Sequence, residues 1–240
     1  MLFSFMYRYR ANILTTNMSL KIYQKDISPP VRAVLMTAEI LKLDYEAIEV
    51  NPVAGEHLTP EYLEKNPLHT VPLLEDGDFF LADSHSIVTY LISKYGGEKQ
   101  KELYPKDLQL RATIDQRMFF DASTLFGAIR SIVIALLLQG APGPTPQQVE
   151  DVNAGYEVVE KYLQKTKFLA CDHLTVADVS CVSIISSLNI LVPIDAKYKQ
   201  LHAWWDGLKA EEWYKTKNQP GLTNYEGFLK SLMKKNSESA

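Results

Sequence analysis

Short strand patterns alternate with helical patterns between residues 20 and 95. Alternating apolar residues predict strands at 20–24 and 45–50, and apolar residues at helical spacing predict a helix between them at 29–43. The region then continues with a helix over 59–66, two strands over 71–83 joined at the Asp76-Gly77 turn, and a helix over 84–95. The resulting order, βαβαββα, predicts a mixed four-stranded sheet.

The second half of the chain has only helical patterns. After a polar linker at 96–107, they cover 108–139, 147–165, 175–191, 197–209 and 221–234. Thr175 and Asp178 form a capping box before an apolar run, so we expect the helix at 175–191 to be the buried centre of this half. We therefore predict an α/β plus all-α fold, divided into a disordered extension at 1–18, an α/β domain at 19–95, a linker at 96–107, an all-α domain at 108–235 and a frayed tail at 236–240.

The first 17 residues contain Arg8 and Arg10, contain no acidic residue, and are followed directly by Met18. A signal peptide is disfavoured because the positive charges follow the short apolar stretch instead of preceding it. A mitochondrial presequence and a disordered extension upstream of the domain both remain open. We favour the extension.

Composition narrows the range of partners. The 240 residues carry a formal net charge of −4, without the basic excess expected of a protein that binds nucleic acid. The longest apolar run, at 132–138, is much shorter than the ~20 residues of a membrane-spanning helix. Cys171 and Cys181 lack the spacing of a disulfide framework or a metal site. We therefore expect a cytoplasmic protein with reduced thiols that binds a small ligand rather than nucleic acid or a membrane.

Five stretches carry a resemblance to a known family: SPPVRAV, GEHLTPEYLEKNPLHTVPLLEDG, DSHSIVTYLISKYG, LYPKDLQLRATIDQRMFFDAS and LTVADVS. With them the chain resembles a cytosolic glutathione transferase, most similar to the insect epsilon class, with the delta class second. The resemblance implies a thioredoxin-like first domain, an all-helical second domain and a homodimer. It also implies a detoxification enzyme that conjugates glutathione, its co-substrate, to hydrophobic electrophiles, with dehydrochlorination and peroxide reduction as further reactions.

Glutathione has two carboxylates, an ammonium and a thiol, so its site needs anion donors, an acid and a group that stabilises the thiolate. The segment Asp83-Ser84-His85 lies where the last predicted strand turns into a helix, whose first N–H groups can bind an anion. By the resemblance, Ser84 binds the γ-glutamyl carboxylate, Asp83 binds the neighbouring ammonium, and His85 belongs to the same site. Without the resemblance, Ser84 reads as an ordinary helix N-cap.

Val71-Pro72 resembles the cis-proline turn of the family, in which the Val71 backbone pairs with the cysteinyl part of glutathione as an added strand would. Thr70 belongs to the same turn. The alternative is a trans proline that opens an edge strand. His57 and His69 match family positions near the cysteinyl-glycine end, and a solvated loop histidine is the alternative for His57.

Ser28 is the candidate for the residue that stabilises the glutathione thiolate. Pro29 and Pro30 begin the next helix without donating N–H groups, so the Ser28 hydroxyl need not cap that helix and can face a sulfur beside its positive end. Tyr23 is the alternative, since other transferase classes use a tyrosine. It lies inside the first predicted strand, and we assign it to the core.

The electrophile site is expected on the second domain. An apolar stripe at helical spacing lies on the helix predicted at 108–139, and such a stripe is more often core than pocket. The resemblance favours a pocket formed by this stripe, by its neighbours and by the last helix. These residues are Pro30, Phe126, Ile129, Arg130, Val133, Leu137, Leu222 and Tyr225. Ile134 stands where some epsilon enzymes carry an acid, which predicts a more apolar pocket.

Two other functions were weighed against this one. A glutathione-dependent ligand carrier with residual conjugation would share the same site, and a turnover assay with a generic electrophile separates the two. A thiol-disulfide oxidoreductase on the same fold needs a cysteine where this chain has Ser28, so we reject it.

Overall fold

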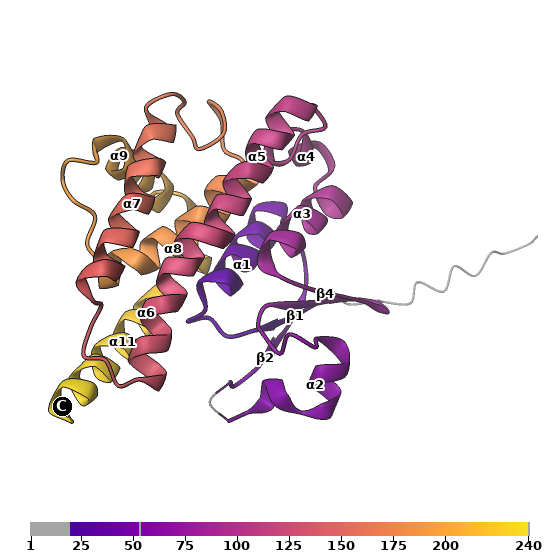
Figure 1. Cartoon of the computed structure of the whole chain (residues 1–240). Helices are drawn as coiled ribbons and strands as arrows, with labels where there is room; N and C mark the ends of the chain where they lie inside the picture. Colours follow the sequence, from indigo (N-terminus) through magenta and orange to yellow (C-terminus); the bar gives the residue numbers. More distant parts are fainter. Residues whose placement is uncertain (1–19, 53, 240) are drawn as a thin grey trace, which may run out of the picture.

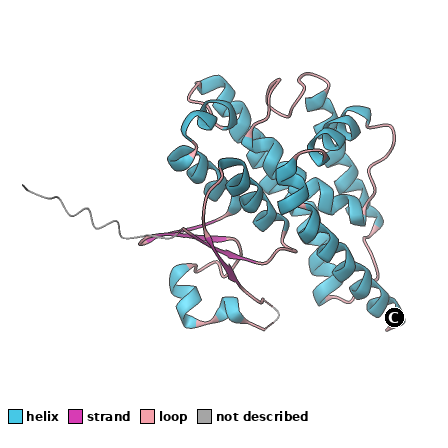
Figure 2. Ribbon diagram, turned by 180° about the vertical axis from the view of Figure 1, so that it is seen from behind, coloured by secondary structure: helices cyan, strands magenta, loops and turns pink. Residues whose placement is uncertain are grey.

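A computed structural model describes residues 20–52 and 54–239 (Figure 1). The extension expected at 1–18 lies outside the described residues, as does the last residue of the tail. Figures 1 and 2 show a small sheet with its helices beside a larger group of helices. The predicted fold class, α/β followed by all-α, is confirmed.

The first domain is a four-stranded sheet with strand order β2-β1-β3-β4. Strand β1 is parallel to β2 and antiparallel to β3, which is antiparallel to β4. Ile22 of β1 pairs with Ala47 of β2 and with Leu74 of β3, and Leu74 pairs with Leu81 of β4. The elements are β1 (Lys21–Gln24), α1 (Pro29–Leu41), β2 (Glu46–Glu49), η1 (Glu56–Leu58), α2 (Pro60–Lys65), β3 (Leu73–Asp76), β4 (Phe79–Ala82) and α3 (Ser84–Tyr95).

The sheet separates two apolar layers because successive side chains of a strand point to opposite faces. Ile22 and Leu74 are fully buried on the face that packs on α1 and α3, and this layer continues into helices of the second domain. Leu73 lies on the other face in a smaller layer with Tyr62 of α2. The larger layer therefore joins the two domains through α1.

The hairpin turn lies one residue later than the sequence predicts. Asp76 is the last residue of β3, and Gly77, with φ of 64°, begins the turn. The Asp76 carboxylate accepts hydrogen bonds from Tyr90, Lys94 and Tyr95 of α3, so this side chain ties the strand to the helix instead of shaping the turn.

The rest of the chain is helical. Its elements are η2 (Gly97–Lys99), α4 (Gln100–Leu103), α5 (Leu108–Phe120), a π-helical turn η3 (Asp121–Leu125), α6 (Phe126–Leu138), α7 (Pro146–Leu163), α8 (Val176–Leu191), α9 (Lys199–Lys209), α10 (Glu212–Lys217) and α11 (Gln219–Glu238).

Two expected boundaries differ from the structure. The linker expected at 96–107 contains η2 and α4, because Leu103 is buried in the core of the first domain. The frayed tail expected from residue 236 continues α11 as far as Glu238. Asn236 is buried, and its amide donates to the carbonyls of Leu136 and Ala141 at the end of α6, which holds the last turn in place.

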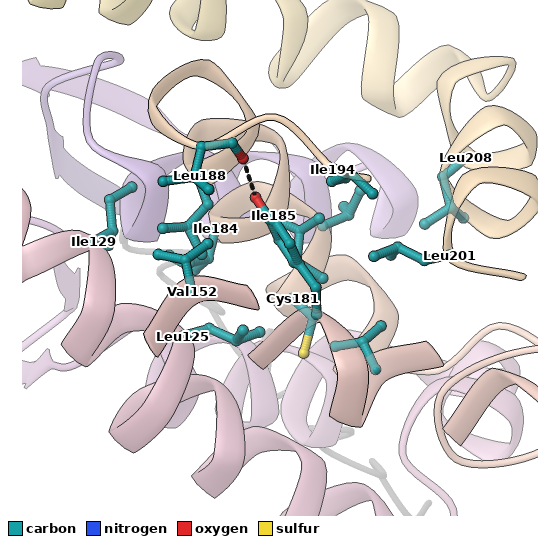
Figure 3. Packing of buried hydrophobic residues seen from close by; sticks show 14 of the residues in the cluster. Leu125, Ile129, Val152, Cys181, Ile184, Ile185, Leu188, Ile194, Leu201 and Leu208 are labelled. Atoms are coloured by element: carbon teal, nitrogen blue, oxygen red, sulfur yellow. Dashed lines mark hydrogen bonds between the residues drawn. The ribbon is translucent and has the colours of Figure 1, made fainter. Parts of the chain in front are cut away.

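Helix α8 is the buried centre of the second domain, as predicted. The backbone N–H and the hydroxyl of Thr175 both donate to the Asp178 carboxylate at its start. Figure 3 shows Cys181, Ile184 and Leu188 of α8 packed among apolar side chains from the surrounding helices.

The helical stretch Leu108–Leu138 has the length and composition of a membrane-crossing helix, the one such stretch within residues 20–52 and 54–239. The sequence analysis predicted a helical segment over 108–139, and α5, η3 and α6 form this continuous rod in Figure 1, but it compared only the apolar run at 132–138 with the length of a membrane-spanning helix. Ile114, Leu125 and Ile132 on this rod are buried in the protein cores. We therefore assign the buried face of this stretch to the core.

Candidate active site

A cavity of about 590 Å³ lies between the two domains. Its lining comes from loops and helix starts of the first domain and from η3, α6, α8 and α11 of the second. The predicted site residues that line it are Ser28, Pro30, Thr70, Val71, Pro72, Asp83, Ser84, His85, Phe126, Ile129, Arg130, Val133, Leu137 and Tyr225. Residues more than a hundred positions apart in the sequence thus share one cavity.

Ser28 lies on the cavity wall directly before α1, with Pro29 and Pro30 in the first turn of the helix. Its side chain makes no capping hydrogen bond to the helix. The Ser28 backbone N–H donates to the Lys25 carbonyl at 2.9 Å, which closes a turn over residues 25–28. The hydroxyl is therefore available to a ligand at the positive end of α1.

Tyr23, the alternative to Ser28, does not line the cavity. Its hydroxyl donates to a Glu75 carboxylate oxygen at 2.6 Å and lies 2.6 Å from the Lys65 ammonium nitrogen. The ring stands edge-on to Tyr62, on the face of the sheet that α2 covers. Tyr23 therefore belongs to the structure of the sheet.

The peptide bond between Val71 and Pro72 is cis, as predicted. The turn before it is held by the Thr70 carbonyl, which accepts from the Tyr62 hydroxyl at 2.7 Å and from the Asn66 amide at 2.9 Å. Thr70, Val71 and Pro72 all line the cavity immediately before β3. This arrangement presents backbone groups to a ligand next to the sheet.

Asp83 and Ser84 lie at the start of α3. Asp83 has φ of 71°, in the left-handed region that is costly for a side chain larger than glycine, and its carboxylate accepts from the Ser86 N–H at 3.0 Å. The His85 ring, whose Nδ1 lies 3.7 Å from the Asp83 carboxylate, is the main cause that lowers the pKa of Asp83, so this carboxylate is charged at neutral pH. Ser84 is buried beside it. A charged acid and the N–H groups of a helix start therefore lie together.

His85 links Asp83 to a buried aspartate of the second domain. Its Nε2 lies 3.0 Å from the Asp121 carboxylate, and its Nδ1 lies 3.7 Å from Asp83. Burial disfavours the imidazolium, but the hydrogen bond to Asp121 and the charges of Asp121 and Asp83 outweigh burial and raise the pKa of His85 to about 9. Asp121 is fully buried and also accepts from the Ser180 hydroxyl at 2.7 Å. The pair at His85 and Asp121 thus joins the polar end of the cavity to α8.

The other part of the cavity is apolar. Phe126, Ile129, Val133 and Leu137 present one stripe of α6 to it, and Ile134 of the same helix also lines it. Ile129 is at the same time part of the packed core in Figure 3, so the stripe serves both core and pocket. The hydroxyl of Tyr225 is buried with no hydrogen-bond partner among the described residues, which leaves it available to a ligand.

Three predicted residues do not line the cavity. His57 and His69 have ring centroids 6.0 Å apart and lie outside its lining, although Leu68, directly before His69, and Pro52, in the loop before η1, are part of it. Leu222 is buried away from it, because the turn of α11 around Gly221 packs directly on the backbone before α1.

The sequence prediction missed several lining residues. Phe228 lies three residues after Tyr225, so helical spacing could have identified it. Asp121, Ser180 and Ser183 had no local signal, because their place in the cavity depends on how η3 and α8 pack against the first domain.

Comparisons with known proteins match both domains. The family model of the glutathione S-transferase N-terminal domain matches residues 22–99, and that of the C-terminal domain matches residues 144–212. The chain is 45% identical to glutathione S-transferase 1 of Manduca sexta over 207 residues, which cover 85% of this chain and 94% of that protein.

Solved structures agree with the sequence matches. The epsilon-class enzyme of the housefly, Musca domestica, superposes with a TM-score of 0.86 at 42% identity, covering 89% of this chain and 98% of that one. A glutathione transferase homologue of Drosophila mojavensis with bound glutathione gives a TM-score of 0.85 at 42% identity, covering 89% and 97%. The expected resemblance is confirmed: the chain belongs to the glutathione S-transferase family, with epsilon-class insect enzymes among its structural neighbours.

Proposed function

We propose that this transferase binds glutathione along the first-domain side of the cavity and stabilises its thiolate with the Ser28 hydroxyl. The observation that carries the proposal is that the Ser28 hydroxyl, which does not cap α1, shares one cavity with the polar groups at Asp83 and Ser84 and with the apolar stripe of α6. Glutathione and a hydrophobic electrophile need these same three environments. The thiolate then attacks an electrophile held against the stripe, and proximity and electrostatic stabilisation supply the acceleration.

The polar end suits the γ-glutamyl group. The Asp83 carboxylate is charged and matches an ammonium, and the start of α3 at Ser84 offers N–H groups to a carboxylate. The backbone of Val71 would pair with the cysteinyl part as a further strand does. For His57 and His69 we propose contact with the glycyl end, outside the cavity lining, where their rings lie side by side.

The energetic demand on Ser28 is modest. A free cysteine thiol has a pKa of ~8.5, and lowering it by ~2 units requires about 2.7 kcal/mol of preference for the anion. One hydrogen bond to a charged group contributes about 1.5–3 kcal/mol, and the start of α1 adds to it. A single serine at this position is therefore sufficient.

The test is a titration of the thiolate absorbance of the glutathione complex. Ser28→Ala should raise the pKa of the bound thiol toward its solution value and lower kcat near neutral pH by roughly ten- to a hundredfold, while glutathione still binds. Activity should partly return at high pH. Ser131→Ala removes an exposed hydroxyl of α6 and serves as the control. An unshifted titration in Ser28→Ala would remove Ser28 from this role.

We also propose a homodimer, as is typical of the family. On α5, Leu108 is 81% exposed and Phe119 is 73% exposed, and a subunit interface on this helix would cover both side chains. Light scattering should give twice the chain mass of 27.2 kDa, and Phe119→Asp should shift the protein toward monomer. A monomeric wild type at micromolar concentration would contradict the proposal.

We place the protein in the cytoplasm. The described cysteines, Cys171 and Cys181, are both free thiols, and Cys181 is buried in the core. Free thiols persist most readily in a reducing compartment. Fractionation of cells that express the full chain tests this, and recovery with mitochondria would instead support a presequence.

A further inference from the structure

Arg32 is a fully buried cation in the first turns of α1. Within residues 20–52 and 54–239, no carboxylate lies at ion-pair distance from its guanidinium, and its hydrogen-bond acceptors are all neutral oxygens. Burial lowers the pKa of Arg32 to about 10, against the opposing effects of Tyr225, Tyr214 and Asp26, so the group is charged at neutral pH. A buried charge without a counter-ion is costly and calls for an explanation.

Arg32 holds the turn that carries Ser28. Its Nη1 donates to the carbonyls of Asp26 at 3.2 Å and Ile27 at 3.0 Å, and its backbone N–H donates to the Ser28 carbonyl at 3.1 Å. The remaining carbonyl, that of Lys25, accepts from the Ser28 N–H. Each carbonyl of the turn 25–28 therefore has a partner, and Arg32 donates to three of the four through its Nη1 and its backbone N–H.

The other end of the guanidinium reaches the second domain. Nε donates to the Asn218 side chain at 2.9 Å, where α10 meets α11, and Nη2 donates to Ser183 and Ser187 of α8. Arg32 thus fixes the turn of the first domain against two helices of the second. No lysine could replace it, because an ammonium lacks the fork of donors that reaches both sides.

Three of the contacts of Arg32 are residues of the cavity wall. Ile27 and Ser183 line the cavity and accept hydrogen bonds from the guanidinium, and the Tyr225 ring lies 5.9 Å from it. The charge therefore stands directly behind the wall next to Ser28. The low-dielectric protein interior screens the Arg32 charge less than water would, so the positive potential of Arg32 extends into the cavity.

We propose that Arg32 is a positioning residue of the thiolate site, which fixes the turn at Ser28 and directs a positive charge without an ion-pair partner toward the bound sulfur. This inference rests on the proposed role of Ser28. It explains why the buried charge has only neutral partners: a carboxylate beside it would cancel the potential that favours the thiolate. The acid–base pair at Asp121 and His85, reached through Ser180 one turn earlier on α8, is already compensated.

Asn218→Asp tests the charge while leaving the shape intact. The new carboxylate can still accept from Arg32 Nε. The Ser186 hydroxyl, which accepts from the Asn218 amide and donates to the Ser183 carbonyl at 3.1 Å, can turn to donate to the carboxylate, because the Ser183 carbonyl still accepts from Ser187 and Arg32. We expect the pKa of the bound glutathione thiol to rise by about one unit, with the dissociation constant of glutathione changed less than about threefold. Gln219→Glu adds the same charge one residue later on the exposed surface and should leave the titration unshifted.

Arg32→Lys tests the fork separately and guards against a folding failure of Asn218→Asp. This variant keeps the positive charge but cannot donate hydrogen bonds to the turn 25–28 and to the second domain at the same time. We therefore expect kcat to fall about tenfold while KM for glutathione changes little. Superimposable thiolate titrations of a folded Asn218→Asp variant and the wild type overturn the inference, as does wild-type kcat in Arg32→Lys. A wild-type complex without thiolate near neutral pH would instead reject the role of Ser28, which keeps the two failures distinct.

Discussion

Two buried ionisable groups contact α8 one turn apart, and they differ in whether their charge is balanced. Asp121, reached by Ser180, lies 3.0 Å from the His85 imidazole, so the two form an ion pair. Arg32, reached by Ser183, has only neutral acceptors. A balanced pair can fix geometry without adding net charge, whereas an unbalanced cation adds potential. The first suits the end of the cavity that meets a zwitterionic group, and the second suits the end that meets a thiolate.

Removing one partner of the ion pair between Asp121 and His85 should cause the largest change, a loss of folding stability. Asp121→Ala leaves the His85 imidazolium partly buried with Asp83 as its remaining acid and deprives Ser180 of its acceptor. Removing one partner of a buried pair costs about 3–5 kcal/mol. Urea unfolding at fixed protein concentration should show this loss, with Asp151→Ala on the exposed face of α7 as a control within about 0.5 kcal/mol of wild type. A similar stability of both variants would mean that the pair is not balanced in the folded protein.

Replacing His85 should remove a pH dependence of the unfolding free energy. Since the pKa of His85 is raised to about 9 from its usual 6.5, the folded state binds an extra proton between these values. The stabilisation is complete below pH 6.5 and is lost as pH rises through 9, up to about 3 kcal/mol in total. In His85→Gln the unfolding free energy should lack this decline. A wild-type profile that is flat from pH 6.5 to 9 would show that His85 is neutral beside Asp121.

Removing the Asp83 carboxylate at the polar end of the cavity should weaken glutathione binding rather than destabilise the fold. The Asp83 side chain is 55% exposed, so Asp83→Ala should raise KM for glutathione about tenfold while kcat at saturation is kept. Asp83 would contact the ammonium equally in the ground state and in the transition state. Asp78→Ala at the exposed hairpin tip is the control. An equal loss in kcat would show that Asp83 acts on the reacting sulfur.

Local patterns predicted most of the fold. The four strands and the helices of the first domain follow from periodicity and from proline in the first turn of α1, and the start of α8 in the second domain follows from its capping box. The hairpin turn was misplaced by one residue because the Asp76 side chain bonds to α3, a tertiary effect that its dipeptide does not reveal. The helical end of the chain was missed for the same reason, since Asn236 is held by carbonyls at the end of α6.

The residues of the candidate site also divide into those that local sequence motifs could locate and those whose place depends on tertiary packing. Ser28 and Asp83 could be located from motifs within a few residues of them. Arg32 and Asp121 could not, because the sequence shows neither that they are buried nor which helices of the other domain surround them. The family resemblance assigned Leu222 to the cavity as part of the last helix, but a Cβ at Gly221 would clash with the Asp26 carbonyl oxygen, so this turn of α11 packs against the first domain.

The smallest effect is expected for a substitution at the apolar end of the cavity. It tests whether Leu222, unlike Phe228, lies outside the electrophile pocket. Phe228→Ala removes a ring from the cavity wall and should raise KM for chlorodinitrobenzene by a fewfold, about 1 kcal/mol, while KM for glutathione is unchanged. Leu222→Ala removes a buried side chain outside the cavity, so it should lower stability and leave both KM values unchanged. Steady-state kinetics with each substrate varied distinguishes the two variants. If Leu222→Ala raised KM for the electrophile as much as Phe228→Ala does, the pocket would extend one turn further along α11, toward the buried guanidinium of Arg32.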